Sequence, residues 1–173
     1  MVRLHLMLAL FCFGCAAEQP DSARTVAAFE VPLATSSDRQ DFLEILREVV
    51  DARGYHVDAW SDEALRHISE LTPITLNASV WRGDDEESMA SAMDFRDRLG
   101  RVWISFPKGE DSQRSTEFRN ALIPRIQARW PDMASLPIMP NGAIPHPRDL
   151  RRTPSGYDVV PSEASKYAAP ERD

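Results

Sequence analysis

Cysteine is scarce in this 173-residue chain: Cys12 and Cys15 are its two cysteines, and both lie within the first fifteen residues. The remainder of the chain therefore has no thiol for a disulfide or for a cysteine metal site. Glycine is also scarce, with seven residues, and neither of the phosphate-binding patterns G-x-G-x-x-G and G-x-x-x-x-G-K-[ST] occurs. A chain of this length can fold as one domain without disulfide or metal. The sequence accordingly predicts neither a cofactor nor a structural metal.

Positive charge is in deficit as well. The chain has 20 Lys and Arg against 27 Asp and Glu, which gives a formal net charge of -7. Nucleic-acid binding depends on clustered Lys and Arg that neutralise phosphates, so this balance argues against a nucleic-acid partner. With 43% hydrophobic and 27% charged residues, the composition is that of an ordinary soluble globular domain.

The chain begins with a short apolar run from Leu4 to Phe13, about ten residues, and Arg3 precedes it. A membrane-spanning helix needs about 20 apolar residues, so this run is too short to be one. Gly14 and Cys15 follow it, and the chain then becomes polar from Glu18 onward. This layout predicts a cleaved export signal.

Residues 1–16 resemble the signal peptides of bacterial lipoproteins, in which a small residue directly precedes an obligatory cysteine. Gly14 and Cys15 match that pattern, whereas Cys12 stands where the family usually has leucine. The resemblance implies cleavage of residues 1–14, lipid on Cys15 as the mature N-terminus, and a lipidated tether over residues 15–23. Several acyl chains anchor a protein stably where one is marginal. Ala16 in place of Asp favours the outer membrane, facing the periplasm; an ordinary secretory signal is the alternative.

The most regular pattern after this segment is a helix that begins at Ser37. Ser37 and Gln40 have the spacing of a capping box, and Gly54 stands where a C-terminal cap belongs. A second, shorter helix is expected to start at Ser61 and to end before Pro73. The apolar positions of the first helix recur at helical spacing: Phe42, Ile45, Leu46, Val49 and Val50.

A third helix is expected over about residues 112–130, with Pro124 kinking it. Strands are expected over residues 24–33, close to a sheet edge because Pro32 lacks an N–H, and over residues 55–60 and 136–140. Between them, period-two alternation predicts a three-stranded antiparallel meander. The alternating residues are Ile74, Leu76, Ala78, Val80, Met89, Met93, Phe95, Val102, Ile104 and Phe106.

These elements predict a single α+β domain over residues 24–145. Its simplest form is a mainly antiparallel sheet of about five to six strands with about three helices packed on one face. A ferredoxin-like core with inserted strands is one such arrangement. Residues 146–173 are rich in proline and polar residues, and we expect them to form an extended or partly disordered tail.

The face of the meander opposite the helices is the candidate binding face, because it combines hydroxyl groups with two tryptophans. An exposed tryptophan among polar residues is typical of recognition surfaces. Either an envelope protein or a glycan suits this surface. The alternative is that the proline-rich tail, or further helix, covers the tryptophans. The residues of this face are Thr75, Asn77, Ser79, Trp81, Trp103 and Ser105.

Catalytic patterns are weak. Ser105 and Lys108 have the S-x-x-K spacing of penicillin-binding and β-lactamase enzymes, but Pro107 and the strand pattern exclude the helix start that this motif needs. His56 and Asp58 would share one face of a strand without a third metal ligand. We therefore expect a membrane-anchored lipoprotein with a non-catalytic binding or accessory domain. The alternative is a periplasmic hydrolase or cell-wall enzyme that uses scattered acids, such as Asp58 or Asp94, with a histidine.

Overall fold

The computed structural model describes residues 20–60, 76–83, 86–94 and 100–168. The expected lipidation site Cys15, the helix expected after Ser61, and Thr75 of the candidate face lie outside these residues. One six-stranded antiparallel sheet organises the chain, in the order β2-β3-β4-β5-β1-β6. The strands are β1 (Thr25–Pro32), β2 (His56–Trp60), β3 (Asn77–Arg82), β4 (Glu87–Asp94), β5 (Arg101–Pro107) and β6 (Ala134–Ser135).

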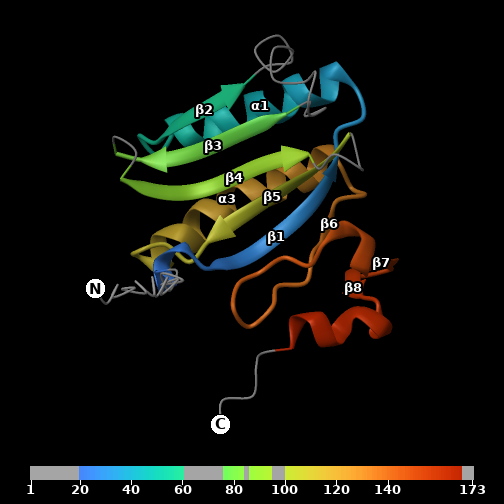
Figure 1. Cartoon of the computed structure of the whole chain (residues 1–173). Helices are drawn as coiled ribbons and strands as arrows, with labels where there is room; N and C mark the ends of the chain where they lie inside the picture. The colour runs from blue at the N-terminus through green and yellow to red at the C-terminus, as the bar shows by residue number, and fades with distance from the viewer. Residues whose placement is uncertain (1–19, 61–75, 84–85, 95–99, 169–173) are drawn as a thin grey trace, which may run out of the picture.

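Two helices connect strands that are not neighbours in the sheet. Helix α1 (Ser36–Asp51) links β1 to β2, and α3 (Ser112–Arg129) links β5 to β6. Because each neighbouring pair is antiparallel, β1 runs in the same direction as β2, and β5 in the same direction as β6. This is the split βαβ arrangement of ferredoxin-like folds, with β3 and β4 as an inserted hairpin. Figure 1 shows both helices on one face of the sheet. The expected α+β fold is confirmed.

The start of α1 differs from the expectation. The N-cap is Thr35 rather than Ser37, and its partner is Asp38 rather than Gln40. The Asp38 N–H donates to Thr35 Oγ1 at 3.0 Å, and the Thr35 N–H donates to Asp38 Oδ2 at 3.0 Å. A threonine followed three residues later by an aspartate can accept from the same kind of backbone N–H groups as a serine followed by a glutamine. The Thr35–Asp38 pair and the Ser37–Gln40 pair therefore both fit the capping-box pattern, and the Thr35–Asp38 pair is the one that forms. After the last turn, Gly54 adopts a φ of +65°, as expected for a residue that reverses the chain.

Helix α3 has nearly the expected bounds. The Asp111 carboxylate caps it by accepting from the N–H groups of Gln113 and Arg114 at 3.0 and 3.2 Å. The helix continues past Pro124 to Arg129. Its buried face meets α1 and the sheet, where Phe42 packs near Trp130. The helix-side core consists mainly of Val31, Leu33, Phe42, Leu46, Val49, Val50, Ala78, Val80, Ala92, Val102, Ile104, Phe106, Phe118, Leu122 and Ile126.

The alternation expected along β4 is interrupted by a bulge. Val80 pairs with Ala90, whereas Trp81 pairs with Ser88, so Met89 is an extra residue. A bulge reverses which residues of a strand face the core on either side of it. Met89 is fully buried, but Met93 is 38% exposed. Period-two alternation without a bulge would place both methionines on one face, whereas the structure places them on opposite faces.

The C-terminal segment, residues 136–167, is folded rather than extended. It contains a β-hairpin between two short 3-10 helices, so the expectation of an extended tail after residue 145 is wrong for the described part. The strand expected over residues 136–140 is replaced by β6, which ends at Ser135. The elements are η2 (Pro147–Asp149), β7 (Leu150–Thr153), β8 (Gly156–Val159) and η3 (Pro161–Tyr167), which lie beside β1 in Figure 1.

At the N-terminal end, η1 (Asp21–Ala23) precedes β1 and joins the domain through its backbone. The Gly109 N–H donates to Ser22 O and the Lys108 N–H donates to Arg24 O, both at 2.8 Å. The last residues of the segment that was expected to be a tether are thus hydrogen-bonded to the domain. Within the described ranges, no helix has both the length and the apolar character needed to cross a membrane.

Candidate binding face

The described residues leave part of the sheet face opposite the helices uncovered. Strand register places alternate side chains of β2, β3, β4 and β5 on that side. We call this surface the open face. Its central residues are His56, Asp58, Asn77, Ser79, Trp81, Ser91, Met93 and Ser105, each exposed or half-buried. Arg101, which is half-buried, projects from β5 on the same side, two residues before Trp103.

A row of polar side chains crosses the open face at right angles to the strands. Asp58 pairs with Ser79, Ser79 with Ser91, and Ser91 with Ser105. The hydroxyls of Ser91 and Ser105 are 2.9 Å apart and hydrogen-bonded. Adjacent strands lie about 4.8 Å apart, so the row presents polar groups at that interval. We call these four residues, which are three serines and one aspartate, the hydroxyl row.

Two apolar side chains flank the hydroxyl row on opposite sides. Trp81 stands two residues beyond Ser79 on β3, and Met93 stands two residues beyond Ser91 on the antiparallel β4. Trp81 is half-buried and belongs to neither buried cluster of the molecule. Met93 is one of the two exposed large hydrophobic side chains among the described residues. This surface thus joins hydroxyl groups to solvent-accessible apolar atoms, as recognition surfaces do.

Trp103 does not belong to the open face, which corrects the expectation that placed it there. It is 4% exposed and packs in a second buried cluster with the C-terminal segment. That cluster consists of Ala28, Trp103, Ala134, Leu136, Leu150 and Tyr157. The covering tail that the sequence left as the alternative is what buries this tryptophan. Asn77, Ser79 and Trp81 keep their expected place.

Buried Glu30 fixes the C-terminal segment to the sheet. Its carboxylate is fully buried and accepts hydrogen bonds from Arg101 Nε at 2.8 Å, Trp103 Nε1 at 3.0 Å and the Tyr157 hydroxyl at 2.6 Å. Burial alone would raise the pKa of Glu30, but the hydrogen bonds from Tyr157, Trp103 and Arg101 outweigh it and lower the pKa. Sequence reasoning missed this contact; a single glutamate within the apolar run of β1 is the sequence signal that could have indicated it.

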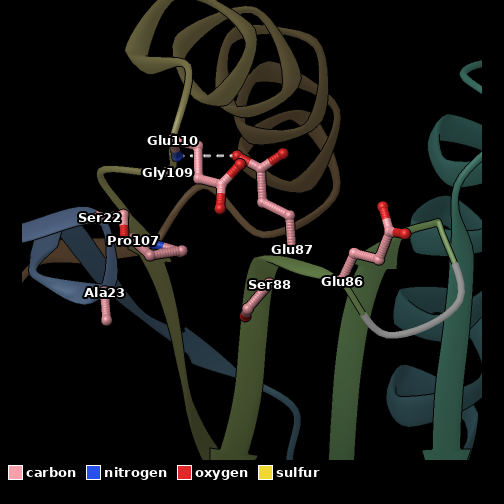
Figure 2. Close-up of a pocket in the computed structure, with 8 residues that line it drawn as sticks. All are labelled: Ser22, Ala23, Glu86, Glu87, Ser88, Pro107, Gly109 and Glu110. Atoms are coloured by element: carbon pink, nitrogen blue, oxygen red, sulfur yellow. Dashed lines mark hydrogen bonds between the residues drawn. The ribbon is translucent and has the colours of Figure 1, made fainter. Parts of the chain in front are cut away.

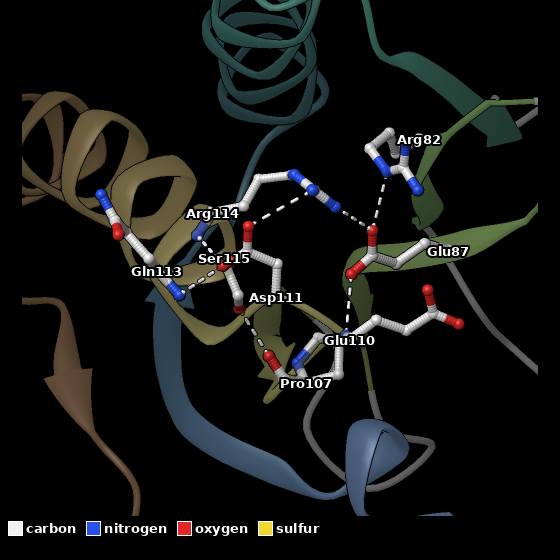
Figure 3. A network of polar contacts seen from close by, with 8 residues as sticks. All are labelled: Arg82, Glu87, Pro107, Glu110, Asp111, Gln113, Arg114 and Ser115. Atoms are coloured by element: carbon white, nitrogen blue, oxygen red, sulfur yellow. Dashed lines mark hydrogen bonds and ion pairs between the residues drawn. The ribbon is translucent and has the colours of Figure 1, made fainter.

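A second buried carboxylate, Glu87, joins the β3–β4 hairpin to the start of α3 (Figure 3). It accepts from Arg82 Nε at 2.7 Å, from Arg114 at 2.8 Å and from the Glu110 N–H at 2.9 Å. Burial alone would raise the pKa of Glu87. The hydrogen bonds from these three donors outweigh burial, so the pKa of Glu87 is lower than that of an ordinary glutamate. Both carboxylate oxygens of Glu87 accept hydrogen bonds from the protein itself, which is typical of a structural contact.

A pocket of about 160 Å³ lies beside Glu87 (Figure 2). Ser22, Ala23, Ser88, Pro107 and Gly109 line it with three glutamates, Glu86, Glu87 and Glu110. Glu87 is held by Arg82 and Arg114, and Glu86 and Glu110 are exposed. The pocket therefore has a mixed polar wall but no pair of groups arranged as nucleophile and base.

The residues of the hydrolase alternative are not brought together. Asp58 is exposed on the open face, whereas Asp94 is buried on the helix side and accepts from the Leu76 N–H at 3.3 Å. His56 shares the open face with Asp58, while His146 lies in the C-terminal segment, where its Nδ1 accepts from the Arg148 N–H. Among the residues that the structure describes, no three His, Cys, Asp or Glu side chains are grouped to hold a metal ion.

No protein-family model matches the chain, and no curated protein matches it.

Proposed function

We propose that this protein is a bacterial lipoprotein of the cell envelope, anchored through lipid on Cys15, and that its domain is a non-catalytic binding or accessory module. The observation that carries the binding role is the open face. The helices cover one side of the sheet and the C-terminal segment covers part of the other, yet Trp81, Met93 and the hydroxyl row remain accessible. An envelope protein or a glycan is the partner that this surface suits.

The open face has the rigidity that a recognition surface requires. Its side chains project from strands whose backbone hydrogen bonds fix their spacing, so little conformational entropy is lost when a partner binds. Both ends of its central strands are also held: Glu87 binds α3 to the hairpin, and Glu30 binds the C-terminal segment to β1 and β5.

The docked N-terminal segment supports a role close to the membrane. Ser22, seven residues after Cys15, accepts a hydrogen bond from Gly109 of the domain. Seven residues span at most about 25 Å, so a lipid on Cys15 would hold the domain near the bilayer surface. In the proposed orientation the domain faces the periplasm from the outer membrane, as Ala16 favours.

The anchor is tested by fatty-acid labelling and membrane fractionation of the full-length chain. We expect Cys15→Ser to abolish incorporation of labelled palmitate and to release the protein from membranes. Cys12→Ser is the matched control and should leave both unchanged. An unmodified wild-type chain, or Cys15→Ser that still incorporates lipid, would contradict the anchor.

The binding role is tested by crosslinked affinity purification of the lipidated chain from membranes. One specific partner should be recovered with the wild type and lost with Trp81→Ala, while circular dichroism shows that the variant is folded. Asn120→Ala on the exposed side of α3 is the control and should retain the partner. Equal recovery with Trp81→Ala would contradict a role for the open face.

A further inference from the structure

We infer that residues 146–167 form a cap that detaches from the sheet as one unit, and that the docked cap is autoinhibitory because it covers Trp103 beside the open face. The autoinhibitory role rests on the proposed function, since it regulates binding through that face. Three features support the inference. The cap holds its own structure together, it meets the sheet through side chains, and its departure leaves Glu30 paired.

The cap, which lies beside β1 in Figure 1, has a network of contacts of its own. Strands β7 and β8 pair with each other and form a separate two-stranded sheet. The backbone oxygen of Asp149 accepts from the Val160 N–H at 2.7 Å, and its carboxylate accepts from the Tyr167 hydroxyl at 2.6 Å. That hydroxyl also accepts from the His146 N–H at 3.0 Å. These contacts lie within the cap, so they persist when it leaves the sheet.

The contacts between the cap and the rest of the domain involve side chains. Leu150 and Tyr157 pack in the apolar cluster that buries Trp103. Water can replace the hydrogen bonds of such side chains, whereas removal of a strand from the large sheet would leave a row of unpaired backbone groups. The hydrogen bonds join the Tyr157 hydroxyl to Glu30, Ser135 Oγ to Ser155 O, and Arg152 to Asp132 O.

Departure of the cap leaves the carboxylate of Glu30 paired. The Tyr157 hydroxyl leaves with the cap, but Arg101 Nε and Trp103 Nε1 donate to Glu30 from the sheet itself, at 2.8 and 3.0 Å. Loss of a partner destabilises a protein strongly when it leaves a buried charge uncompensated. Here the guanidinium of Arg101 still compensates the charge, so the cap can leave while the sheet stays folded.

Detachment enlarges the open face. Met93 is 38% exposed and pairs with Trp103, which in turn pairs with Glu30. The docked cap interrupts this row, because Trp103 beneath it is 4% exposed. Without the cap, the indole of Trp103 adjoins the exposed thioether of Met93. A partner that contacts both side chains binds the detached state selectively, so cap docking and partner binding compete.

Cysteine labelling of the full-length chain tests detachment. Ala134 pairs with Glu30 and belongs to the cluster that the cap covers, whereas Ala92 lies in the helix-side core. A thiol reagent is applied without denaturant to Ala134→Cys or Ala92→Cys. Mass spectrometry of the peptide that carries each introduced cysteine separates it from Cys12 and Cys15. We expect labelling at position 134 to be faster by about tenfold or more, because it requires only local opening. Equal rates would overturn the inference.

Two further changes show which motion exposes each introduced cysteine. Tyr157→Phe weakens cap docking and should raise labelling at position 134 by about tenfold or more, since it removes a hydrogen bond to a charged group. Ile126→Val weakens the helix-side core and should raise labelling at position 92 by about two- to tenfold. It should leave position 134 unchanged, because the core stays folded when the cap detaches. An equal effect of Ile126→Val at both positions, or no effect of Tyr157→Phe at position 134, would contradict detachment as a unit.

Autoinhibition is tested by photo-crosslinking from position 91 in cells, with and without Tyr157→Phe. We expect Tyr157→Phe to raise the yield of a Trp81-dependent product several-fold, because more molecules then have the cap detached. A yield equal to or below that of the wild type would overturn autoinhibition and leave the proposed function standing. If neither chain gives a Trp81-dependent product, the proposed function is wrong and autoinhibition with it.

Discussion

The phenolic hydroxyl of Tyr157 donates a 2.6 Å hydrogen bond to the buried carboxylate of Glu30, 127 residues earlier in the chain. Arg101 and Trp103 donate to the same carboxylate. Because Tyr157 lies on β8 and Glu30 on β1, this contact makes the C-terminal segment part of the folded domain. It also sets the boundary of the open face, since Trp103 is covered on one side of that boundary and Ser91 is exposed on the other.

Replacing Tyr157 with Phe should loosen the C-terminal segment. The change removes a buried hydrogen bond to a charged group, so we expect the free energy of unfolding to fall by about 1.5 to 3 kcal/mol. Amide hydrogen exchange should increase first in residues 150–159, with little change in α1. Tyr167→Phe, which alters a hydroxyl bound to Asp149, is the control and should leave exchange in β1 unchanged. Equal exchange of β7 and β8 in the wild type and Tyr157→Phe would contradict this role.

Stability should depend on pH through Glu30. Its pKa is lowered in the folded state, so its contribution is fully present above the ordinary glutamate value, about 4.3, and is lost as the pH falls through the lower folded pKa. We expect Glu30→Gln to be less stable than the wild type at pH 7 by about 2 to 3 kcal/mol, with the difference narrowing below about pH 4.3. Urea unfolding from pH 7 to pH 3 measures this.

A matched variant separates this effect from general acid unfolding. Glu44→Gln changes an exposed carboxylate on α1 and should keep a small, nearly constant difference from the wild type. A difference between the wild type and Glu30→Gln that grows as the pH falls would have the wrong sign and would contradict the account.

Gly156→Ala should separate β8 from β6. A Cβ at this position would lie 2.3 Å from Ser135 Oγ and 2.6 Å from Ser135 O, and Gly156 has a φ of +146°. The serine hydroxyl can rotate away but the backbone oxygen cannot, so we expect a loss of about 1 to 3 kcal/mol in the free energy of unfolding. Gly54→Ala is the control: its φ is also positive, but no atom lies within 4 Å of the added Cβ. A smaller loss at Gly156 than at Gly54 would show that the close contact with Ser135 is not limiting.

The local patterns predicted most of the sheet and its two described helices because those elements carry their own signals. Alternation predicted β3 and β5, cap residues and apolar spacing predicted α1, and apolar residues at helical spacing predicted α3. The capping pair of α1 was wrong by two residues, because Thr35 with Asp38 and Ser37 with Gln40 fit the same rule. The alternation through Met89 and Met93 did not reveal that the two residues lie on opposite faces, because a bulge depends on the pairing of two strands, which one strand's sequence does not contain.

The C-terminal segment was the larger error. Its prolines and polar residues are typical of extended chain, and its packing depends on Leu150 and Tyr157 meeting Ala28 and Trp103 on strands far away in sequence. The same long-range contact determines the extent of the candidate site. It buries Trp103, whereas Trp81 stays half-buried on the open face. Alternation was sufficient to predict which face of the meander carries the hydroxyl groups. It could not predict which part of that face the C-terminal segment covers.

Site-specific photo-crosslinking in intact cells tests the central claim, that the open face is the surface through which this protein acts. A photoreactive amino acid is placed at Ser91 on the open face or at Asn120 on α3, both exposed, in the full-length chain. The account predicts a discrete crosslinked product, to protein or to glycan, from position 91, its loss when Trp81→Ala is added, and no product from position 120. Products of equal yield from both positions, or none from position 91 in a folded, membrane-bound chain, would contradict it.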